Sequence, residues 1–395
     1  MMAKYAFIVP PLTGHINPTL SLGSELLDRN HSVSWICLDP ELNKQLPKGG
    51  ELLIPPIEAS NEEKSKLIAY AKELQKKKVY GIDSLKFLYE EVLTPMNSLM
   101  IQGIEKILQK YKPDVIIHDH QIYAGSVAAL KYNIPYATSV TAPASIKVNA
   151  NFPKIYEWEG EQIIKFQNNN GILKNERLDC SSLLTLVYTS KIFFGENNLP
   201  SNFKFIGPAI ATRHLNIEFD WKKFEIIGNN RPKILVSIGT NFDYKQKIEF
   251  FNKIIEAFED QEVAVVLISD PNLFKKIPKN FIIQNKIPQL EIIPHIQLVI
   301  CHGGNNTVCE ALSEGIPLVV IPIAYDQSFI STCVVENGVG IRLNFNRFKV
   351  EHLKNAVTTI LNENSFKENA HFIQKSFKEA GGIKKGADYL EQLLN

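Results

Sequence analysis

Short apolar runs alternate with helical patterns along all 395 residues of the chain. In the first half, the apolar runs predict strands at residues 5–9, 33–38, 52–54, 115–118 and 136–140. In the second half, they predict strands at residues 234–238, 263–268, 281–283, 298–301 and 318–321. Strands that alternate with helices form parallel sheets with helices on both faces. The sequence therefore predicts an α/β protein with two doubly wound domains in tandem.

The segments between these runs predict where helices and domains begin. The first helix is expected to start with Asn17 as N-cap and Pro18 in its first turn, and to run to Asn30. A long helical region is expected at residues 61–111, and the domain boundary in the polar stretch 206–221. We therefore place the first domain at residues 1–210, the second at 222–375 and a C-terminal helix at 376–395.

Composition and charge limit the partners and the compartment. A chain of this length suggests two cores, and a formal net charge of +1 gives no reason to expect a nucleic-acid partner. The N-terminal apolar run is too short for a signal peptide, and no stretch approaches the ~18 apolar residues of a membrane span. Five cysteines without paired short spacings are typical of reduced thiols. We expect a soluble cytoplasmic protein, a monomer or weak dimer, without a transmembrane segment.

The segment 302–327, HGGNNTVCEALSEGIPLVVIPIAYDQ, carries the clearest chemistry. The apolar run 298–301 leads through Gly303 and Gly304 into a helix that is expected to open at Asn305. Glycines let a ligand approach the backbone closely, and the N–H groups at a helix start favour an anion. The turn is therefore suited to a phosphate group.

Three polar residues follow within the same segment. Glu310 lies one helical turn beyond Asn306, so it should face the same way and could accept from ribose hydroxyls. Asp326 and Gln327 come after the next apolar run, and an acceptor beside an amide suits the hydroxyls of a sugar. Taken in order, the segment is suited to a diphosphate, a ribose and a hexose.

This pattern closely resembles the nucleotide-sugar signature of the UDP-dependent glycosyltransferases. That inverting GT-B family includes macrolide, carotenoid and plant secondary-metabolite glucosyltransferases. The resemblance implies two Rossmann-like domains that face each other across a cleft. The first would bind the acceptor, the second would bind the nucleotide sugar, and the C-terminal helix would pack back on the first. The matching positions are His302, Gly304, Thr307, Glu310, Gly315, Pro317, Pro322, Asp326 and Gln327, with Pro288 and Gln289 upstream.

The resemblance also implies which residues meet the donor. In the family, an aromatic residue that stacks on uracil usually stands two places before the Pro-Gln pair, but here that place holds Lys286. Gln289 remains to contact the base, so both a UDP-sugar and a dTDP-sugar stay open as donors. The implied donor-binding residues are Ser237, Gly239, Thr240, Ile287, Gln289, His302, Gly304, Asn305, Asn306, Thr307, Glu310, Asp326 and Gln327.

The turn after the first expected strand reads PPLTGHINP and lacks the GxGxxG pattern of dinucleotide-binding domains, which argues against hydride transfer. Its His15 matches the histidine that serves as general base in the resembling family. A catalytic histidine needs a carboxylate to fix its tautomer and stabilise its cation. Asp119, at the end of strand 115–118, matches the family's partner aspartate, whereas Asp114 precedes that strand and should lie at the opposite edge of the sheet.

The neighbouring His118 and His120 raise the question of a metal site. Because neighbours on a strand alternate faces, both should point away from Asp119, and no third ligand is near in sequence. We therefore expect no metal and no cofactor, with the nucleotide sugar acting as co-substrate.

These inferences favour a metal-independent, inverting glycosyltransferase that moves a hexose, expected to be glucose, from a UDP-sugar to a hydroxyl of a small apolar acceptor such as a natural product. Apolar residues within 142–165 either wall an acceptor pocket or pack that segment on the sheet. Two alternatives remain. One is a non-hydrolysing sugar-nucleotide epimerase of the same architecture, and the other is a catalytically silent donor-binding subunit. Retention of His15 and Asp119 argues against the silent subunit.

Overall fold

The computed structural model describes residues 2–58, 86–147, 152–195, 198–210, 217–239, 244–323 and 326–394. Residues 61–85 of the expected helical region 61–111 therefore lie outside the described part. The chain forms two compact units. Unit 1 comprises Met1–Lys191, Glu196–Ala211 and Glu379–Asn395, and unit 2 comprises Ile192–Gly195 and Thr212–Lys378. Within the described ranges, no helix is both long and apolar enough to cross a membrane.

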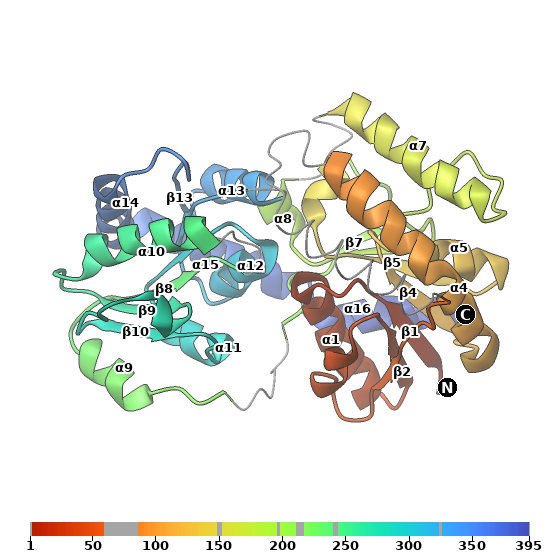
Figure 1. Ribbon diagram of the computed structural model, residues 1–395, viewed down its shortest axis with the longest axis horizontal. Helices are drawn as coiled ribbons and strands as arrows, with labels where there is room; N and C mark the ends of the chain where they lie inside the picture. Colours follow the sequence, from red (N-terminus) through yellow and green to blue (C-terminus); the bar gives the residue numbers. More distant parts are fainter. Residues whose placement is uncertain are drawn as a thin grey trace. The chain divides into compact units, whose positions relative to one another are not determined.

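Unit 1 is built on a parallel sheet of seven strands in the order β3-β2-β1-β4-β5-β6-β7 (Figure 1). Every residue of β4 and β5 is buried, as expected for strands covered on both faces. The strands are β1 Lys4–Ile8, β2 Ser32–Ile36, β3 Glu51–Leu53, β4 Val115–Asp119, β5 Tyr136–Val140, β6 Leu184–Val187 and β7 Phe203–Phe205.

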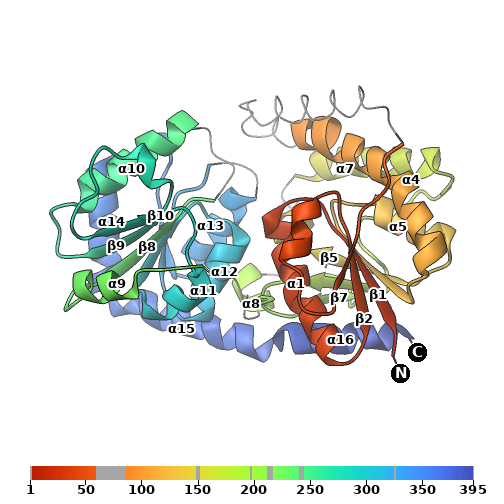
Figure 2. The same cartoon turned by 60° about the horizontal axis from the view of Figure 1, so that its bottom comes forward.

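Helices cover both faces of this sheet. On one face, Phe7 and Trp35 belong to a buried cluster with residues of α1 and α16, two helices that lie side by side (Figure 2). On the other face, Ala6 and Ile8 pack with residues of α4, α5 and α7. The helices of unit 1 are α1 Thr13–Asp28, α4 Thr94–Tyr111, α5 Ala124–Lys131, α7 Pro153–Asn169, α8 Lys191–Phe194, which ends in unit 2, and α16 Gly382–Glu391, with a π-helical turn at Leu88–Leu93 and 3₁₀ turns at Pro40–Lys44, Pro143–Lys147 and Gln392–Leu394.

The start of α1 differs from the expectation. The helix begins at Thr13, ahead of Asn17, and Pro18 lies inside it. The amides of His15 and Ile16 both donate to the carbonyl of Leu12, at 2.9 and 3.0 Å, so backbone groups close the first turn without a side-chain cap. A proline this close to a helix start removes a single main-chain hydrogen bond, which the burial of the helix outweighs. His15 therefore lies in the first turn of α1 rather than before the helix.

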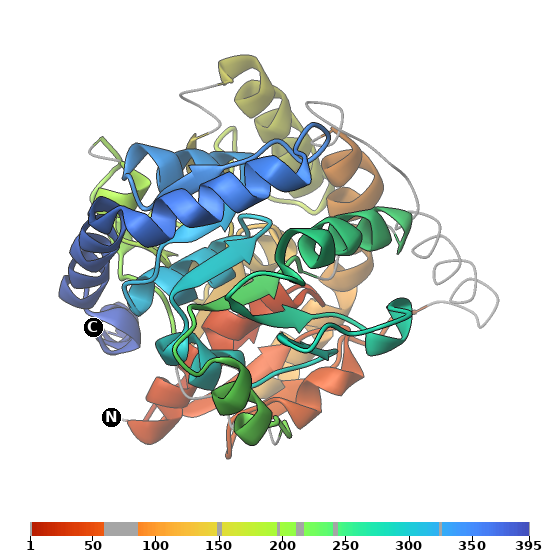
Figure 3. The ribbon, with the colours of Figure 1, turned by 90° about the vertical axis from the view of Figure 1, so that its left-hand side faces the viewer.

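Unit 2 has a six-stranded parallel sheet in the order β10-β9-β8-β11-β12-β13, with helices on both faces (Figure 3). Leu235 packs with α12, α13 and α15 on one face, and Val236 packs with α10 and α14 on the other. The strands are β8 Lys233–Ser237, β9 Ala264–Ile268, β10 Phe281–Gln284, β11 Leu298–Cys301, β12 Leu318–Val320 and β13 Gly340–Arg342. The helices are α9 Trp221–Ile227, α10 Tyr244–Phe258, α11 Gln289–Ile292, α12 Asn305–Ser313, α13 Gln327–Glu336, α14 Val350–Asn362 and α15 Asn364–Glu379, with 3₁₀ turns at Pro271–Leu273 and Ile293–His295.

The C-terminal helix α16 belongs to unit 1. Nη1 of Arg29, at the end of α1, donates to Asp388 at 2.9 Å and to Glu391 at 2.8 Å. Nε2 of His31 lies 2.9 Å from the other oxygen of Glu391. The chain thus returns to its first helix through both apolar packing and ion pairs.

Candidate active site

Three side chains from separate elements of unit 1 meet at the carboxyl ends of its strands. His15 lies in the first turn of α1, Asp119 is the last residue of β4, and Thr141 directly follows β5. Strands β4 and β5 are neighbours, with Asp119 opposite Ser139, so the residues that follow them lie close together. Ligands of open parallel sheets bind at this edge.

A closed hydrogen-bond network joins the three side chains. Nδ1 of His15 lies 2.9 Å from Oδ2 of Asp119 and 2.7 Å from Oγ1 of Thr141. The Thr141 hydroxyl donates to the same Asp119 oxygen at 2.7 Å. Because a carboxylate only accepts, Nδ1 of His15 carries a proton, and Nε2 is the basic nitrogen of the neutral ring. The structure thus brings His15 and Asp119 together and adds Thr141, which the sequence pattern did not single out.

Asp119 is ionised in this setting although none of its surface is exposed. Burial by itself would raise its pKa. The charges of His15 and His120, with hydrogen bonds from His15 and from the Gln121 amide, hold the pKa of Asp119 well below its ordinary value. The Gln121 amide donates to Oδ1 at 2.9 Å. Asp119 can therefore orient a neutral His15 and stabilise its protonated form.

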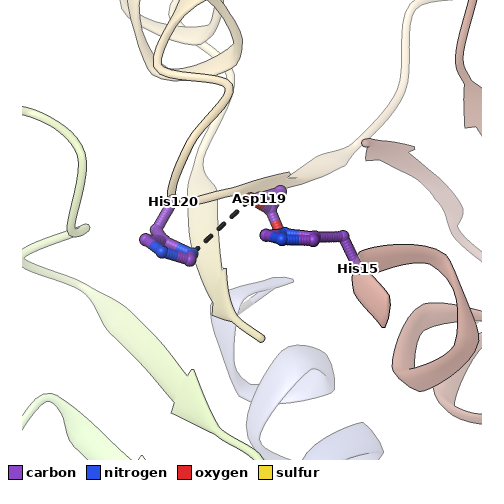
Figure 4. A group of neighbouring side chains, drawn as sticks. All are labelled: His15, Asp119 and His120. Carbon is purple, nitrogen blue, oxygen red and sulfur yellow. Dashed lines mark hydrogen bonds and ion pairs between the residues drawn. The ribbon is translucent and has the colours of Figure 1, made fainter. Parts of the chain in front are cut away.

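The two histidines beside Asp119 face different ways. His118 points away, as expected, and its Nε2 lies 2.9 Å from the Thr138 hydroxyl. The expectation for His120 was wrong, because its Nδ1 lies 3.5 Å from Oδ1 of Asp119 and its ring stacks on that of His15, with centroids 6.0 Å apart (Figure 4). Strand β4 ends at Asp119 and the chain turns at His120, so the alternation of a strand no longer applies there.

Burial lowers the pKa of both histidines, that of His118 to about 4. Desolvation penalises their charged forms, so each ring is neutral at neutral pH. The rival carboxylate, Asp114, lies at the amino ends of the strands, where it accepts from the Lys4 amide at 2.8 Å. Asp114 is thus at the opposite edge of the sheet from His15, as the sequence predicted.

In unit 2, the turn between β11 and α12 is shaped by two close contacts. Gly303 has φ +83°, and a Cβ there would lie 2.6 Å from Oγ of Ser331. A Cβ at Gly304 would lie 2.7 Å from Nε2 of His302. Glycine is therefore required at position 303 by its left-handed backbone, whereas a Cβ at position 304 would displace the His302 ring, which lies directly over the start of α12.

The His302 ring also covers the turn after β8, since a Cβ at Gly239 would lie 2.9 Å from it. Burial lowers the pKa of His302 to about 4, against the opposing effect of a hydrogen bond to the Ser237 backbone. The single N–H of a neutral His302 is the donor of that bond, so the ring has no second N–H for a ligand and brings no full positive charge. Ser237 ends β8 beside this ring, and Thr240 lies outside the described residues.

Two of the residues expected to contact the nucleoside, Gln289 and Glu310, are joined by a hydrogen bond. Nε2 of Gln289 donates to Glu310 at 2.6 Å, and Glu310 is buried on α12. The Ile287 side chain belongs to the apolar core of unit 2, so only its backbone can meet a ligand. Lys286 is exposed. The structure therefore joins Gln289 to Glu310 but leaves no aromatic side chain at position 286.

The residues in the first turn of α12 differ in how exposed their side chains are. Asn305 is buried, with Oδ1 accepting from Sγ of Cys309 at 3.6 Å, whereas Asn306 and Thr307 are half-buried. The first N–H groups of a helix have no partner within the helix. The backbone at Asn305 and the groups of Asn306 and Thr307 are therefore the parts of this turn that can meet an anion.

Asp326 and Gln327 stand at the start of α13, after β12. The Gln327 side-chain carbonyl accepts from the Ile323 amide at 2.9 Å. Asp326 is half-buried. Both residues thus follow the carboxyl end of β12, and their contact with a sugar stays a prediction.

The chain is similar in sequence and in fold to known proteins. A family model described as UDP-glucoronosyl and UDP-glucosyl transferase matches residues 190–379. The chain is 30% identical to the NDP-glycosyltransferase YjiC of Bacillus licheniformis, over 97% of this chain and 96% of that protein. It is 24% identical to the demethyllactenocin mycarosyltransferase of Streptomyces fradiae, over 100% and 87%. A crystal structure of the calicheamicin glycosyltransferase CalG4 matches with a TM-score of 0.78 and 22% identity, over 100% of this chain and 98% of that chain.

Two parallel α/β units together with this structural likeness define a GT-B fold made of two Rossmann-like domains. The protein is a glycosyltransferase, and its chain belongs to the UDP-glucoronosyl and UDP-glucosyl transferase family. The fold class and the enzyme class predicted from the sequence are thereby confirmed. The family implies a nucleotide-sugar donor and an acceptor substrate, and these relatives do not favour either the epimerase or the silent subunit.

Proposed function

We propose that the protein is an inverting, metal-independent transferase that moves a hexose, expected to be glucose, from a UDP-sugar to a hydroxyl of a small apolar acceptor. The observation that carries this proposal is the network of His15, Asp119 and Thr141. The names of the Streptomyces relative and of CalG4 concern natural products, which supports an acceptor of that class.

In the proposed reaction, Nε2 of His15 takes the proton of the acceptor hydroxyl while that oxygen attacks the anomeric carbon. The bond from this carbon to the diphosphate breaks on the opposite face, so the configuration inverts and the nucleoside diphosphate leaves. Asp119 then holds the positive imidazole through Nδ1–H. The tautomer of His15 with its proton on Nδ1 accounts for both roles, because Nδ1–H bonds Asp119 and Nε2 is left to accept the acceptor's proton.

Unit 2 would supply the donor site. Charge on the leaving diphosphate would be met by the backbone at the start of α12 and by Asn306, Thr307 and His302. Glu310, which accepts from Gln289, would bind the ribose. The proposed sugar contacts are Asp326 and Gln327 at the start of α13.

The sequence leaves two nucleotides possible for the donor, UDP and dTDP. Lys286 is exposed and has no ring that could stack on a base. Of the residues expected to contact the base, only Gln289 would then discriminate uracil from thymine. The Bacillus relative is named as an NDP-glycosyltransferase, which is compatible with either base. We infer UDP as the preferred carrier and expect a measurable reaction with dTDP-sugars.

A matrix of UDP- and dTDP-sugars against hydroxylated natural products, analysed by mass spectrometry, tests the proposal. The expected product is acceptor plus one hexose, and NMR of its anomeric proton should show inversion. Each UDP-sugar incubated without acceptor is the control. Isomerised sugar in that control, with no glycoside in any pair, would contradict the proposal and favour an epimerase.

A further inference from the structure

One cluster of metal-ligating side chains lies in unit 1. His15, Asp119 and His120 each offer a ligand atom, and these atoms all lie within 4.8 Å of one another. Figure 4 shows the two imidazole rings beside the carboxylate, with His120 reaching it from the turn after β4 and His15 from α1. It is the one such group found among the described residues.

His120 is the unexplained member of the group. Its ring is 94% buried, because its relative exposure is only 6%, yet neither ring nitrogen has a hydrogen-bond partner within the described structure. Buried polar side chains nearly always have such a partner. The nearest acceptor is Oδ1 of Asp119, at 3.5 Å from Nδ1. A buried, unpartnered imidazole directed toward a carboxylate is an unused ligand.

We propose that His15, Asp119 and His120 form a binding site for a divalent transition-metal ion such as Zn²⁺, and that the bound ion inhibits the transferase. Two imidazoles and one carboxylate are ligands that Zn²⁺ favours, and three protein ligands leave a fourth position for water. Mg²⁺ and Ca²⁺ prefer sites made of oxygen atoms, so they should bind poorly here.

The distances suit such a site after small side-chain rotations. Zinc holds nitrogen and oxygen ligands at about 2.0–2.2 Å, so two ligands of a tetrahedral site lie about 3.3 Å apart. Nδ1 of His15 lies 2.9 Å from Oδ2 of Asp119, Nδ1 of His120 lies 3.5 Å from Oδ1, and the three ligand atoms all lie within 4.8 Å of one another. The His15 side chain is 14% exposed, which gives the ion a route from solvent.

Inhibition follows from the two nitrogens of His15. Coordination through Nδ1 replaces its hydrogen bond to Asp119 and leaves the ring proton on Nε2, which can then no longer accept one. Coordination through Nε2 occupies the basic lone pair itself. Either mode blocks the base, so the inhibitory effect rests on the proposed function of His15, whereas metal binding does not.

Calorimetric titration of the full chain with Zn²⁺ tests the site directly. The matched variants are His120→Gln, which removes one ligand, and His371→Gln, which removes an exposed histidine of α15 in unit 2. We expect one strong site in the wild type and in His371→Gln, and an affinity at least about 10-fold weaker in His120→Gln. Equal affinities for wild type and folded His120→Gln would overturn the proposal.

Two further measurements separate binding from function. Tetrahedral Co²⁺ gives a visible absorption band, which should appear with the wild type and be lost in both His120→Gln and His15→Gln. Because His15 lies in the first turn of a helix and its side chain is not fully buried, its variant serves if His120→Gln does not fold. Zn²⁺ should inhibit transfer over the concentrations at which it binds, and EDTA should restore activity. Binding without inhibition would overturn the inhibitory part alone and would count against His15 as the base.

Discussion

Thr141 is the residue whose role depends most directly on the observed geometry. Its hydroxyl contacts both His15 and Asp119, so Thr141→Val removes two hydrogen bonds while keeping the shape of the side chain. A hydrogen bond to a charged group contributes about 1.5–3 kcal/mol, and the catalytic rate should therefore fall by about 10-fold or more. The measurement is kcat with saturating donor.

Calorimetry with UDP is the control for Thr141→Val, because the donor residues lie in unit 2 and their affinity for the nucleotide should not change. An unchanged kcat in a variant with wild-type stability would mean that Asp119 alone orients the imidazole.

His15 and Asp119 should behave as one unit in kinetics. His15→Ala should lower the rate by about 10²–10⁴-fold, the usual contribution of a positioned acid or base. Asp119→Asn should also slow the reaction, since an amide can misorient the imidazole and does not stabilise its cation. The double variant should be little slower than His15→Ala. Single-turnover assays of all three decide this, and near-normal transfer by His15→Ala at pH 7 would remove His15 as the base.

At the same scale, the sequence indicated His15 and Asp119 but missed Thr141 and His120. The signal for Thr141 was present, because a hydroxyl residue directly follows the expected strand 136–140, next to the strand that ends in Asp119. His120 was assigned to the wrong side because strand alternation was applied to it, although strand β4 ends one residue earlier, at Asp119. A turn that starts at His120 depends on packing, which local sequence patterns do not encode.

Helix α12 is the element on which the donor site depends. Glu310→Ala removes the partner of Gln289 as well as the expected acceptor for the ribose, so UDP binding should weaken by about 1–3 kcal/mol. Glu314→Ala, at the exposed end of the same helix, is the matched control. Calorimetry with UDP checks both variants, and equal affinities for Glu310→Ala and wild type would move the ribose contact elsewhere.

Helix α7 contains a buried carboxyl group that should make stability depend on pH. Burial raises the pKa of Glu159 to about 7, with Arg177 opposing and Asp179 adding to the shift. In the unfolded chain this group ionises near its ordinary pKa of 4.5, so the folded state binds an extra proton between pH 4.5 and about 7. The stability that comes from protonated Glu159 is therefore present below about pH 4.5 and lost as pH rises through about 7.

Glu159→Gln should flatten that part of the stability curve, because an amide does not titrate. Urea unfolding of both proteins from pH 5 to pH 8 measures the difference. The same slope in the two proteins would show that Glu159 is ionised in the folded state.

Among the elements, long apolar runs were located within one or two residues, whereas no range was predicted for β6, β7 and β13. β7 and β13 are three-residue strands at the edges of their sheets with at most one buried residue each, so burial gives them no clear apolar run. The start of α1 was placed too late because Asn17 and Pro18 are typical of a helix start, whereas the true first turn is closed by backbone bonds to Leu12 and has only Ile16 buried. Local sequence patterns therefore located the core elements, whereas contacts made in the folded chain set where those elements begin and end.

At the scale of the whole molecule, we expect the transfer reaction to need no metal ion at the diphosphate of the donor. Activity should persist in EDTA, because helix-terminal donors in unit 2 would meet the diphosphate and the one metal-ligating group among the described residues lies in unit 1. Initial rates with and without chelator provide the measurement. Loss of activity that only Mg²⁺ or Mn²⁺ restores would contradict metal independence, whereas a rise in EDTA would fit removal of a bound inhibitory ion.

The return of α16 to α1 has a consequence for biosynthesis. Leu22 of α1 lies against Gly386, where a Cβ would come within 3.1 Å of it, and the ion pairs of Arg29 close the same contact. The ribosome makes all of unit 2 before it reaches residues 382–391. Unit 1, although residues 1–191 emerge before unit 2, therefore cannot complete its core until unit 2 has been translated. A nonsense codon just before α16 would leave the helix that carries His15 without its cover, and a cell would meet that product as a substrate for its quality-control proteases.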